Sequence, residues 1–158
     1  MNASDSARRN VELKAKDPDP ERSLAMCHSL GAVDRGVIAQ RDTYFEVPNG
    51  GLKLREESPG DPHLIQFQRA NRPQQRQSSY RIIPIEDSAS LLAALRESLG
   101  ERGVVMKRRH LFLWGEVRIH LDEVQGLGSF LELEAVTPAA SNLSREYELV
   151  AELRMHFA

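Results

Sequence analysis

The chain has 158 residues, of which 41% are hydrophobic and 28% are charged, and its formal net charge is −2. This balance is typical of a globular protein, and the length is enough for one domain with a sizeable core. The near-neutral charge excludes bulk attraction to nucleic acid or to a membrane surface, so any site for a polyanion must come from local arrangement.

The N-terminal segment and the cysteine content indicate where the protein resides. Residues 1–9 lack the apolar centre of a signal peptide and predict a short disordered lead, followed by a single domain over 10–158. No apolar run approaches the roughly 18 residues of a membrane span. The one cysteine, Cys27, permits no internal disulfide, and its place on a predicted amphipathic helix favours a buried structural thiol. We expect a cytoplasmic protein with no nucleic-acid or membrane partner.

The predicted elements follow one another with short connections. A first strand over 10–16 is stopped by Asp-Pro-Asp-Pro, and Asp19 and Pro20 predict the start of a helix that ends near Gly31. Residues 70–77 have no apolar periodicity and predict a mobile loop. The other predicted helices cover about 88–99 and 142–155, and the other predicted strands cover 34–47, 52–57, 63–69, 80–85, 103–113, 116–123 and 129–136. Short connections favour antiparallel neighbours.

Several of these strands carry charge on alternate residues. In 10–16, 52–57, 116–123 and 129–136, charged side chains alternate with apolar ones, so each strand has one charged face and one apolar face. Charged faces cannot pack together dry, because unpaired buried charge is too costly. The pattern therefore predicts an α+β fold in which an eight-stranded antiparallel barrel encloses a wet charged tunnel and three helices cover its outside. The alternative is a half-open sheet whose charges face solvent.

Two carboxylates on one strand predict a metal site. Glu132 and Glu134 are two residues apart, which places them about 7 Å apart on one face of a strand. Hard cations such as Mg²⁺ or Mn²⁺ take oxygen ligands of this kind, and Glu12 and Asp122 are candidates to complete the set. The alternative is that these carboxylates form salt bridges with the cationic strands.

A larger set of cations predicts a phosphate site. Lys53 and Arg55 form one pair on a strand face, and Lys107 and Arg109 form another. Their ammonium and guanidinium groups supply the donors that phosphate oxygens need, and their number suits several adjacent phosphates. His120 lies between Arg118 and Asp122 on one face, where it could act as a base, a metal ligand or a hydrogen-bonding wall residue. The further cations that could join are Lys14, Arg69, Arg81 and Arg118.

At these residues the chain resembles the CYTH family, the triphosphate tunnel metalloenzymes, and especially its class IV adenylate cyclase branch. The segment Asn10-Val11-Glu12-Leu13-Lys14 occupies the place of the family's E-x-E-x-K strand. The segments 40–45, 52–55, Lys107-x-Arg109 and 118–134 resemble later strands of the family, and the resemblance covers nearly the whole chain. The first hallmark glutamate is replaced by Asn10, which offers a carbonyl oxygen but no charge.

The resemblance implies a fold and a set of roles. It implies an eight-stranded antiparallel tunnel that holds a triphosphate together with Mg²⁺ or Mn²⁺. The metal ligands would be Glu12, Glu132 and Glu134, with Asp122 near them. The expected catalytic residues are Lys14, Arg55 and Asp122. The phosphate-binding residues would be Lys14, Lys53, Arg55, Lys107, Arg109 and Arg118, together with the less securely aligned Arg69 and Arg81.

The expected function is a divalent-metal-dependent reaction of a small triphosphate compound, in a chain that could be a homodimer. If the 3′-hydroxyl of ATP attacks, the products are cyclic AMP and pyrophosphate. If water attacks, the reaction is hydrolysis of thiamine triphosphate or inorganic tripolyphosphate. The alternatives are a non-catalytic binder of polyphosphate or nucleotides, and a scaffold whose barrel only displays helices.

Overall fold

The computed structural model describes residues 7–69 and 75–158. Within these, the strands are β1 Arg8–Lys16, β2 Val33–Phe45, β3 Gly51–Ser58, β4 His63–Arg69, β5 Arg76–Pro84, β6 Glu101–Trp114, β7 Val117–Val124 and β8 Gly128–Thr137. The helices are α1 Pro20–Ser29, α2 Ser88–Leu99 and α3 Ser144–Phe157. None of these helices is both long and apolar enough to cross a membrane.

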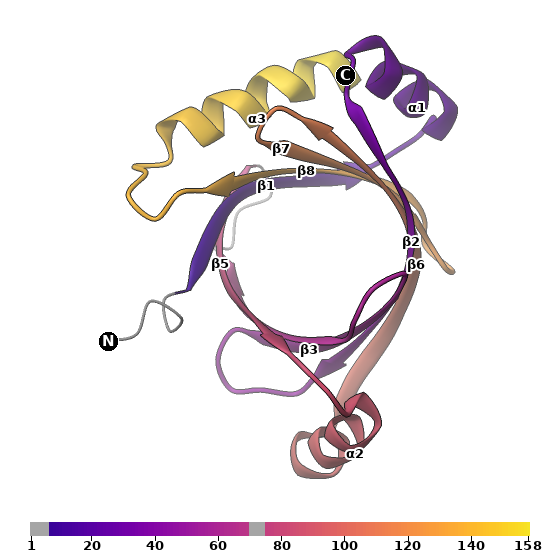
Figure 1. Ribbon diagram of the computed structural model, residues 1–158, viewed down its shortest axis with the longest axis vertical. Coiled ribbons are helices and arrows are strands. Elements are labelled where there is room, and N and C mark those ends of the chain that lie inside the picture. The colour runs from indigo at the N-terminus through magenta and orange to yellow at the C-terminus, as the bar shows by residue number, and fades with distance from the viewer. Residues whose placement is uncertain (1–6, 70–74) are drawn as a thin grey trace.

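The strands close into a barrel in the order β1-β5-β4-β3-β2-β6-β7-β8 (Figure 1). Every neighbouring pair is antiparallel. Because the barrel is closed, the described strands leave no unpaired sheet edge. The predicted eight-stranded antiparallel barrel with flanking helices is confirmed, and the half-open sheet is excluded.

Two strands begin inside segments for which no regular structure was predicted. β1 begins at Arg8, inside the predicted disordered lead, and β5 begins at Arg76, inside the predicted loop over 70–77. These two strands pair with each other, with Arg8 opposite Tyr80 and Arg76 opposite Glu12. Pairing between strands distant in sequence supplies hydrogen bonds that local composition does not reveal. Residues 1–6 of the predicted lead and 70–74 of the predicted loop lie outside the described residues.

The hydrophobic core lies outside the barrel, between β1, β7 and β8 and the two helices α1 and α3. Val11, Ile119 and Leu133 point outward from their strands and are fully buried against Val150 and other apolar residues of this layer. Cys27 belongs to the same cluster, and burial raises the pKa of its thiol to about 12. The predicted buried structural thiol is therefore confirmed, and the charged face of these strands points into the barrel.

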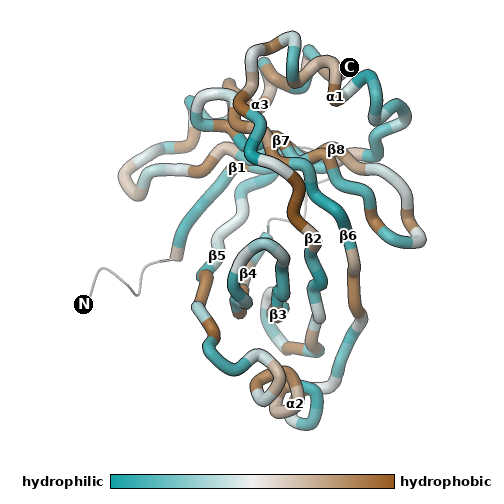
Figure 2. Tube along the Cα trace, turned by 45° about the vertical axis from the view of Figure 1, so that its right-hand side comes forward, coloured by the Kyte–Doolittle hydropathy of each residue, from teal (hydrophilic) through white to brown (hydrophobic). Residues whose placement is uncertain are grey.

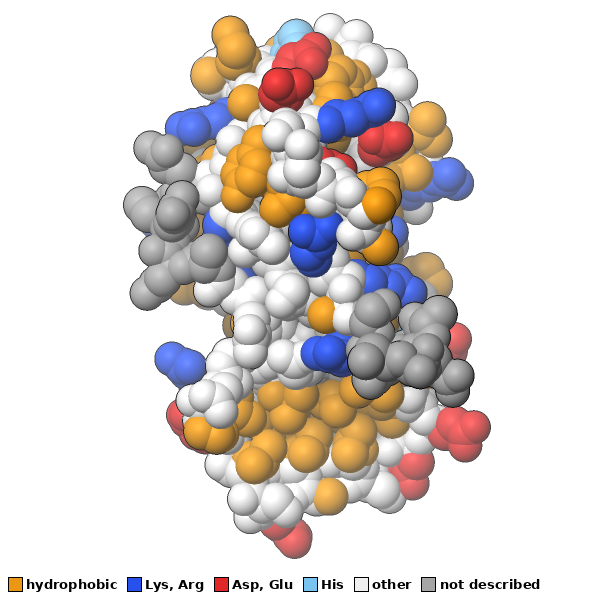
Figure 3. All heavy atoms as spheres, turned by 90° about the vertical axis from the view of Figure 1, so that its left-hand side faces the viewer, with side chains coloured by type: hydrophobic (Ala, Val, Ile, Leu, Met, Phe, Trp, Pro, Cys, Tyr) orange, Lys and Arg blue, Asp and Glu red, His pale blue; other side chains and the backbone are white. Residues whose placement is uncertain are grey.

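The third helix covers less than predicted. Asp87 caps α2 at its N-terminus, but α2 has no buried residue, and it contacts β2 and β3 on the side opposite α1 and α3 (Figure 1). The prediction that all three helices bury the apolar outside of the barrel is wrong here, since Ile83 and Leu99 are exposed. In Figure 2, α2 lies apart at one end of the molecule, and Figure 3 shows hydrophobic side chains gathered on the surface toward it.

Candidate active site

The inward faces of the strands bring most of the predicted site residues to one cavity. The cavity has a volume of about 220 Å³ and is lined by residues from all eight strands, so charges distant in sequence meet in it. This confirms the predicted charged lumen. The predicted residues that line it are Glu12, Lys14, Lys53, Arg55, Arg69, Lys107, Arg109, Arg118, Glu132 and Glu134.

Arg81 is placed elsewhere, contrary to its predicted role. Tyr80 and Ile82 line the cavity, so Arg81 between them points to the outside of β5. There its guanidinium donates a hydrogen bond of 3.1 Å to Gln66 on the neighbouring strand. Since side chains alternate between the two faces of a strand, and Tyr80 and Ile82 point inward, Arg81 lies outside the tunnel.

On one side of the lumen, a buried aspartate holds two of the cations. Asp42 is fully buried, and its two oxygens accept hydrogen bonds of 2.8 Å from Arg55. Lys53 lies 3.2 Å from the same carboxylate. Burial opposes the charge of Asp42, but the Arg55 hydrogen bonds and Lys53 outweigh it and keep the pKa of Asp42 well below its usual range. Asp42 is a site residue that was not predicted.

Lys53 is the cation most affected by its surroundings. Burial, followed by repulsion from Arg55, lowers the pKa of Lys53 to about 7. Asp42 raises the pKa of Lys53, but its effect is smaller than that of burial and of Arg55. Lys53 also lies over the rings of Tyr44 and Phe67, at 5.5 and 5.7 Å from their centroids. A bound polyanion would add to the counter-charge that Lys53 receives from Asp42.

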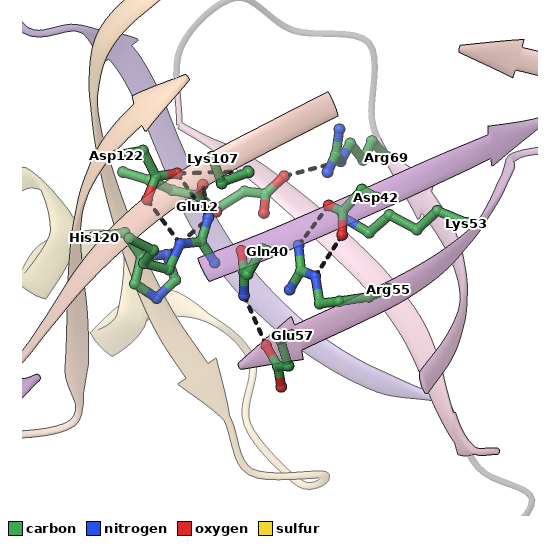
Figure 4. A network of polar contacts seen from close by, with 12 residues as sticks. Glu12, Gln40, Asp42, Lys53, Arg55, Glu57, Arg69, Lys107, His120 and Asp122 are labelled. Atoms are coloured by element: carbon green, nitrogen blue, oxygen red, sulfur yellow. Dashed lines mark hydrogen bonds and ion pairs between the residues drawn. The ribbon is translucent and has the colours of Figure 1, made fainter. Parts of the chain in front are cut away.

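On the other side of the lumen, Asp122 binds one arginine and one lysine, as Asp42 does. Asp122 accepts two hydrogen bonds of 2.8 Å from Arg109 and lies 3.5 Å from Lys107 (Figure 4). These bonds hold the pKa of Asp122 below its ordinary value despite burial, and burial lowers the pKa of Lys107 to about 8. Asp122 was predicted to join the metal ligands, but its carboxylate is occupied by Arg109 and is absent from the acidic group described below. It orients cations instead.

Glu12 forms a third cluster of charge. It lies 3.2 Å from Arg69 and 3.0 Å from Arg76. Burial is the largest influence and raises the pKa of Glu12, with these two arginines opposing it. Arg76 was missed because it falls in the predicted loop, and Arg8, which also lines the cavity, was missed because it falls in the predicted lead. Arg76, Ser78 and Tyr80 lie at alternate positions and share one face of β5, and this spacing could have predicted the longer strand.

Glu132, Glu134 and His120 form the group that fits a metal ion. One ligand atom from each lies within 4.8 Å of the others, and no other group of three or more such residues occurs in the described chain. Arg109 is the main influence that overcomes burial and holds the pKa of Glu132 well below its usual range, so this carboxylate is ionised. Carboxylates and a neutral imidazole are a ligand set that divalent cations accept. The residues present therefore fit a divalent metal.

One part of the cavity wall is apolar. Ile65 and Ile82 face each other across β4 and β5, and Val136 of β8 lines the same cavity. Ile82 and Val136 lie near the ends of their strands and are 39% and 37% exposed, which places them at a mouth of the tunnel. Tyr44 and Phe67 add two rings in an edge-to-face arrangement with centroids 6.4 Å apart. The cavity thus joins a strongly cationic interior to an apolar rim.

A larger hollow of about 750 Å³ is not this site. It is lined by Arg41, Met106 and Arg108, which alternate along β2 and β6 with residues of the lumen. It therefore lies on the outside of the barrel, beside the turn between β7 and β8. Among the described residues, Lys107 is the one that lines both spaces, and the other residues of the titratable clusters described above do not line this hollow.

Comparison with known proteins agrees with this geometry. The sequence model of the CYTH domain matches residues 8–153. No protein with a curated description matches the sequence. Among solved structures, the PH1012 protein of Pyrococcus horikoshii superposes with a TM-score of 0.83 at 22% identity, over 94% of this chain and 89% of that one.

Two further structures share the fold at lower similarity. A protein of Vibrio parahaemolyticus described as a "putative adenylate cyclase" has a TM-score of 0.76 and 21% identity, over 96% of this chain and 90% of its own. HpAC1 of Hippeastrum, described with a dominant triphosphatase activity, has a TM-score of 0.62 and 14% identity, over 93% of this chain and 87% of its own. At these identities the likeness shows the fold alone.

Proposed function

Since this chain belongs to the CYTH domain family, we propose that it is a divalent-metal-dependent enzyme that acts on small triphosphate compounds. The observation that carries the proposal is the meeting of Lys53, Arg55, Lys107 and Arg109 in one cavity with Glu132 and Glu134. The cations suit a chain of phosphates, and the carboxylates suit a metal that accompanies them.

The cations are oriented before any substrate arrives. Asp42 fixes Arg55, and Asp122 fixes Arg109, each through two hydrogen bonds of 2.8 Å. Donors held in place in a cavity with limited water stabilise developing charge without the cost of reorganisation. Arg55 and Arg109 would bind the phosphates by their remaining N–H groups, and Lys53 and Lys107 would gain a counter-charge.

The metal ligands in this scheme are Glu132 and Glu134. A bound Mg²⁺ or Mn²⁺ would neutralise charge on the phosphate oxygens and polarise the phosphate that reacts. Arg109 would hold Glu132 in place, since it donates a hydrogen bond of 3.2 Å to that carboxylate. Lys14 of β1 is paired with Glu132 of β8. Lys14 would therefore lie beside the phosphates, close to the metal.

The apolar rim supports an organic triphosphate as the substrate. Ile65, Ile82 and Val136 offer no donor to a phosphate but can receive a ring or base attached to it. Attack by water would give hydrolysis, and attack by a ribose hydroxyl would give a cyclic nucleotide and pyrophosphate. The fold likeness to the Vibrio parahaemolyticus protein and to HpAC1 of Hippeastrum is consistent with either reaction.

A panel of substrates tests the proposal. The protein is incubated with Mg²⁺ or Mn²⁺ and with ATP, thiamine triphosphate or tripolyphosphate, and phosphate, pyrophosphate and cyclic AMP are measured. We expect metal-dependent turnover of at least one compound, which Glu134→Ala abolishes while circular dichroism shows an intact fold. Tight metal-independent binding without any turnover would favour the non-catalytic binder, and activity that survives Glu134→Ala would remove Glu134 from the metal site.

A further inference from the structure

A buried imidazole in the lumen lacks a hydrogen-bond partner on one nitrogen. The side chain of His120 is 4% exposed, and its Nδ1 has no hydrogen-bond partner within the described residues. Leaving a buried polar atom unpaired costs about 1–3 kcal/mol, so the atom calls for an explanation. The nearest acidic atom is Oε1 of Glu132 at 3.8 Å, which is too long for a hydrogen bond.

The two oxygens of Glu132 face different partners. Oε2 accepts a hydrogen bond of 3.2 Å from Arg109, whereas Oε1 is turned toward His120. Arg109 is therefore satisfied without occupying the side of Glu132 that faces the imidazole. Glu134 completes the group, and no hydrogen bond or ion pair joins its carboxylate to another described residue.

The spacing of the group suits a shared ion. The candidate ligand atoms of His120, Glu132 and Glu134 lie within 4.8 Å of one another. Two ligands on opposite sides of an ion with bonds of about 2.1 Å are separated by about 4.2 Å, so small side-chain adjustments suffice. An unprotonated imidazole nitrogen offers a lone pair to such an ion.

We infer that His120 is itself a metal ligand, and that this tunnel holds its ion by one imidazole nitrogen and the carboxylates of Glu132 and Glu134. Imidazole is a poor ligand for Mg²⁺ and a better one for transition metals. The site therefore prefers Mn²⁺ to Mg²⁺. The inference rests on the proposed function only in taking the ion to be divalent.

Direct metal binding tests the inference without any substrate. Mn²⁺ alone is added to the protein, its affinity and that of Mg²⁺ are measured by titration calorimetry, and the bound Mn²⁺ is examined by electron spin-echo spectroscopy for modulation by a directly bound nitrogen. We expect this modulation in the unmodified protein. His120→Gln should remove it and weaken Mn²⁺ binding about tenfold, with a smaller effect on Mg²⁺.

A second histidine and a second ligand provide the controls. His110→Gln alters an outer-surface histidine that pairs with Asp34 at 2.8 Å, and it should change neither the modulation nor the affinity. Glu134→Gln should weaken both metals. Bound Mn²⁺ without nitrogen modulation, modulation that survives His120→Gln, or no Mn²⁺ binding would each overturn the inference. Binding with modulation but without turnover of any triphosphate would uphold it while removing the proposed function.

Discussion

Arg109 of β6 and Asp122 of β7 are partner residues on adjacent strands of the lumen wall and are joined by two hydrogen bonds of 2.8 Å. The same guanidinium reaches Glu132 at 3.2 Å, so it links the cation-holding aspartate to the candidate metal ligands. Arg55 and Asp42 repeat the first part of this arrangement between β3 and β2. Two of the arginines in the lumen are therefore each held in position by a buried aspartate.

Removing Asp122 should destabilise the fold. Asp122→Ala leaves Arg109 and Lys107 buried without their shared counter-ion, which costs about 3–5 kcal/mol when one partner of a buried pair is lost. Urea denaturation measures the free energy of unfolding. Asp34→Ala, at a half-exposed carboxylate, is the control and should cost much less. Equal losses in the two variants would show that the Asp122 brace is unimportant.

Lys53 should make stability depend on pH. Its pKa is lowered to about 7 in the folded protein, against a reference value of 10.5, so between these values the unfolded chain binds a proton that the folded protein does not. The free energy of unfolding should therefore rise with pH across this window, by at most about 1.4 kcal/mol per unit for one group. Lys53→Met should flatten the rise in denaturation measured from pH 7 to 10. An unchanged slope would show that Lys53 keeps an ordinary pKa.

Arg55 and Arg81 should differ in their effect on substrate binding. Arg55→Ala removes a lumen guanidinium and should raise KM about tenfold or more while lessening its dependence on salt. Arg81→Ala changes the same residue type on the outside of the barrel and should leave KM within about twofold. Steady-state kinetics at two salt concentrations compares them. If Arg81→Ala has the larger effect, the assignment of inward residues is wrong.

Asn10 should limit metal binding. It lines the cavity, and its Oδ1 has no hydrogen-bond partner among the described residues. Asn10→Glu adds a negative charge there and should tighten metal binding or increase the number of ions bound, which titration calorimetry reports. Asn10→Gln, which adds length without charge, should have no such effect. Identical titrations for both variants would place Asn10 outside the metal's surroundings.

The apolar rim should select organic substrates. Ile82→Asp places a charge where a ring or base would lie, and it should lower kcat/KM for the preferred organic triphosphate about tenfold relative to tripolyphosphate. The neighbouring residue provides the control, because Ile83 points outward and is exposed, so Ile83→Asp should not alter the ratio. A ratio unaffected by Ile82→Asp would mean that the rim does not touch the substrate.

The barrel was predictable because alternation is a local property of the sequence. A strand that places Glu12 and Lys14 on one face and Val11 and Leu13 on the other has few arrangements that satisfy both faces. The convergence of Lys53, Arg109 and Glu132 followed from the same rule. These features needed no knowledge of which strands were neighbours.

The errors came from features that depend on pairing between distant strands. Arg8 and Arg76 have no local strand signal and become inward residues only because β1 pairs with β5. Asp122 was predicted to be a metal ligand because the sequence does not give the register between β6 and β7. That register places Arg109 of β6 beside it. For the same reason Asp42 was not assigned a role, and the role of His120 was left open between a base, a metal ligand and a wall residue. Alternation gives the face of a residue, whereas the partner of a charge depends on register.

The central claim is that the inward cations hold a triphosphate inside the barrel. A crystal structure of the protein soaked with a non-hydrolysable ATP analogue and Mn²⁺ tests it most directly. The account predicts the phosphate chain in the lumen, in contact with Lys53, Arg55, Lys107 and Arg109, and Mn²⁺ at Glu132 and Glu134. An analogue bound only on the outer surface, with the lumen cations still paired to Asp42 and Asp122 alone, would contradict it.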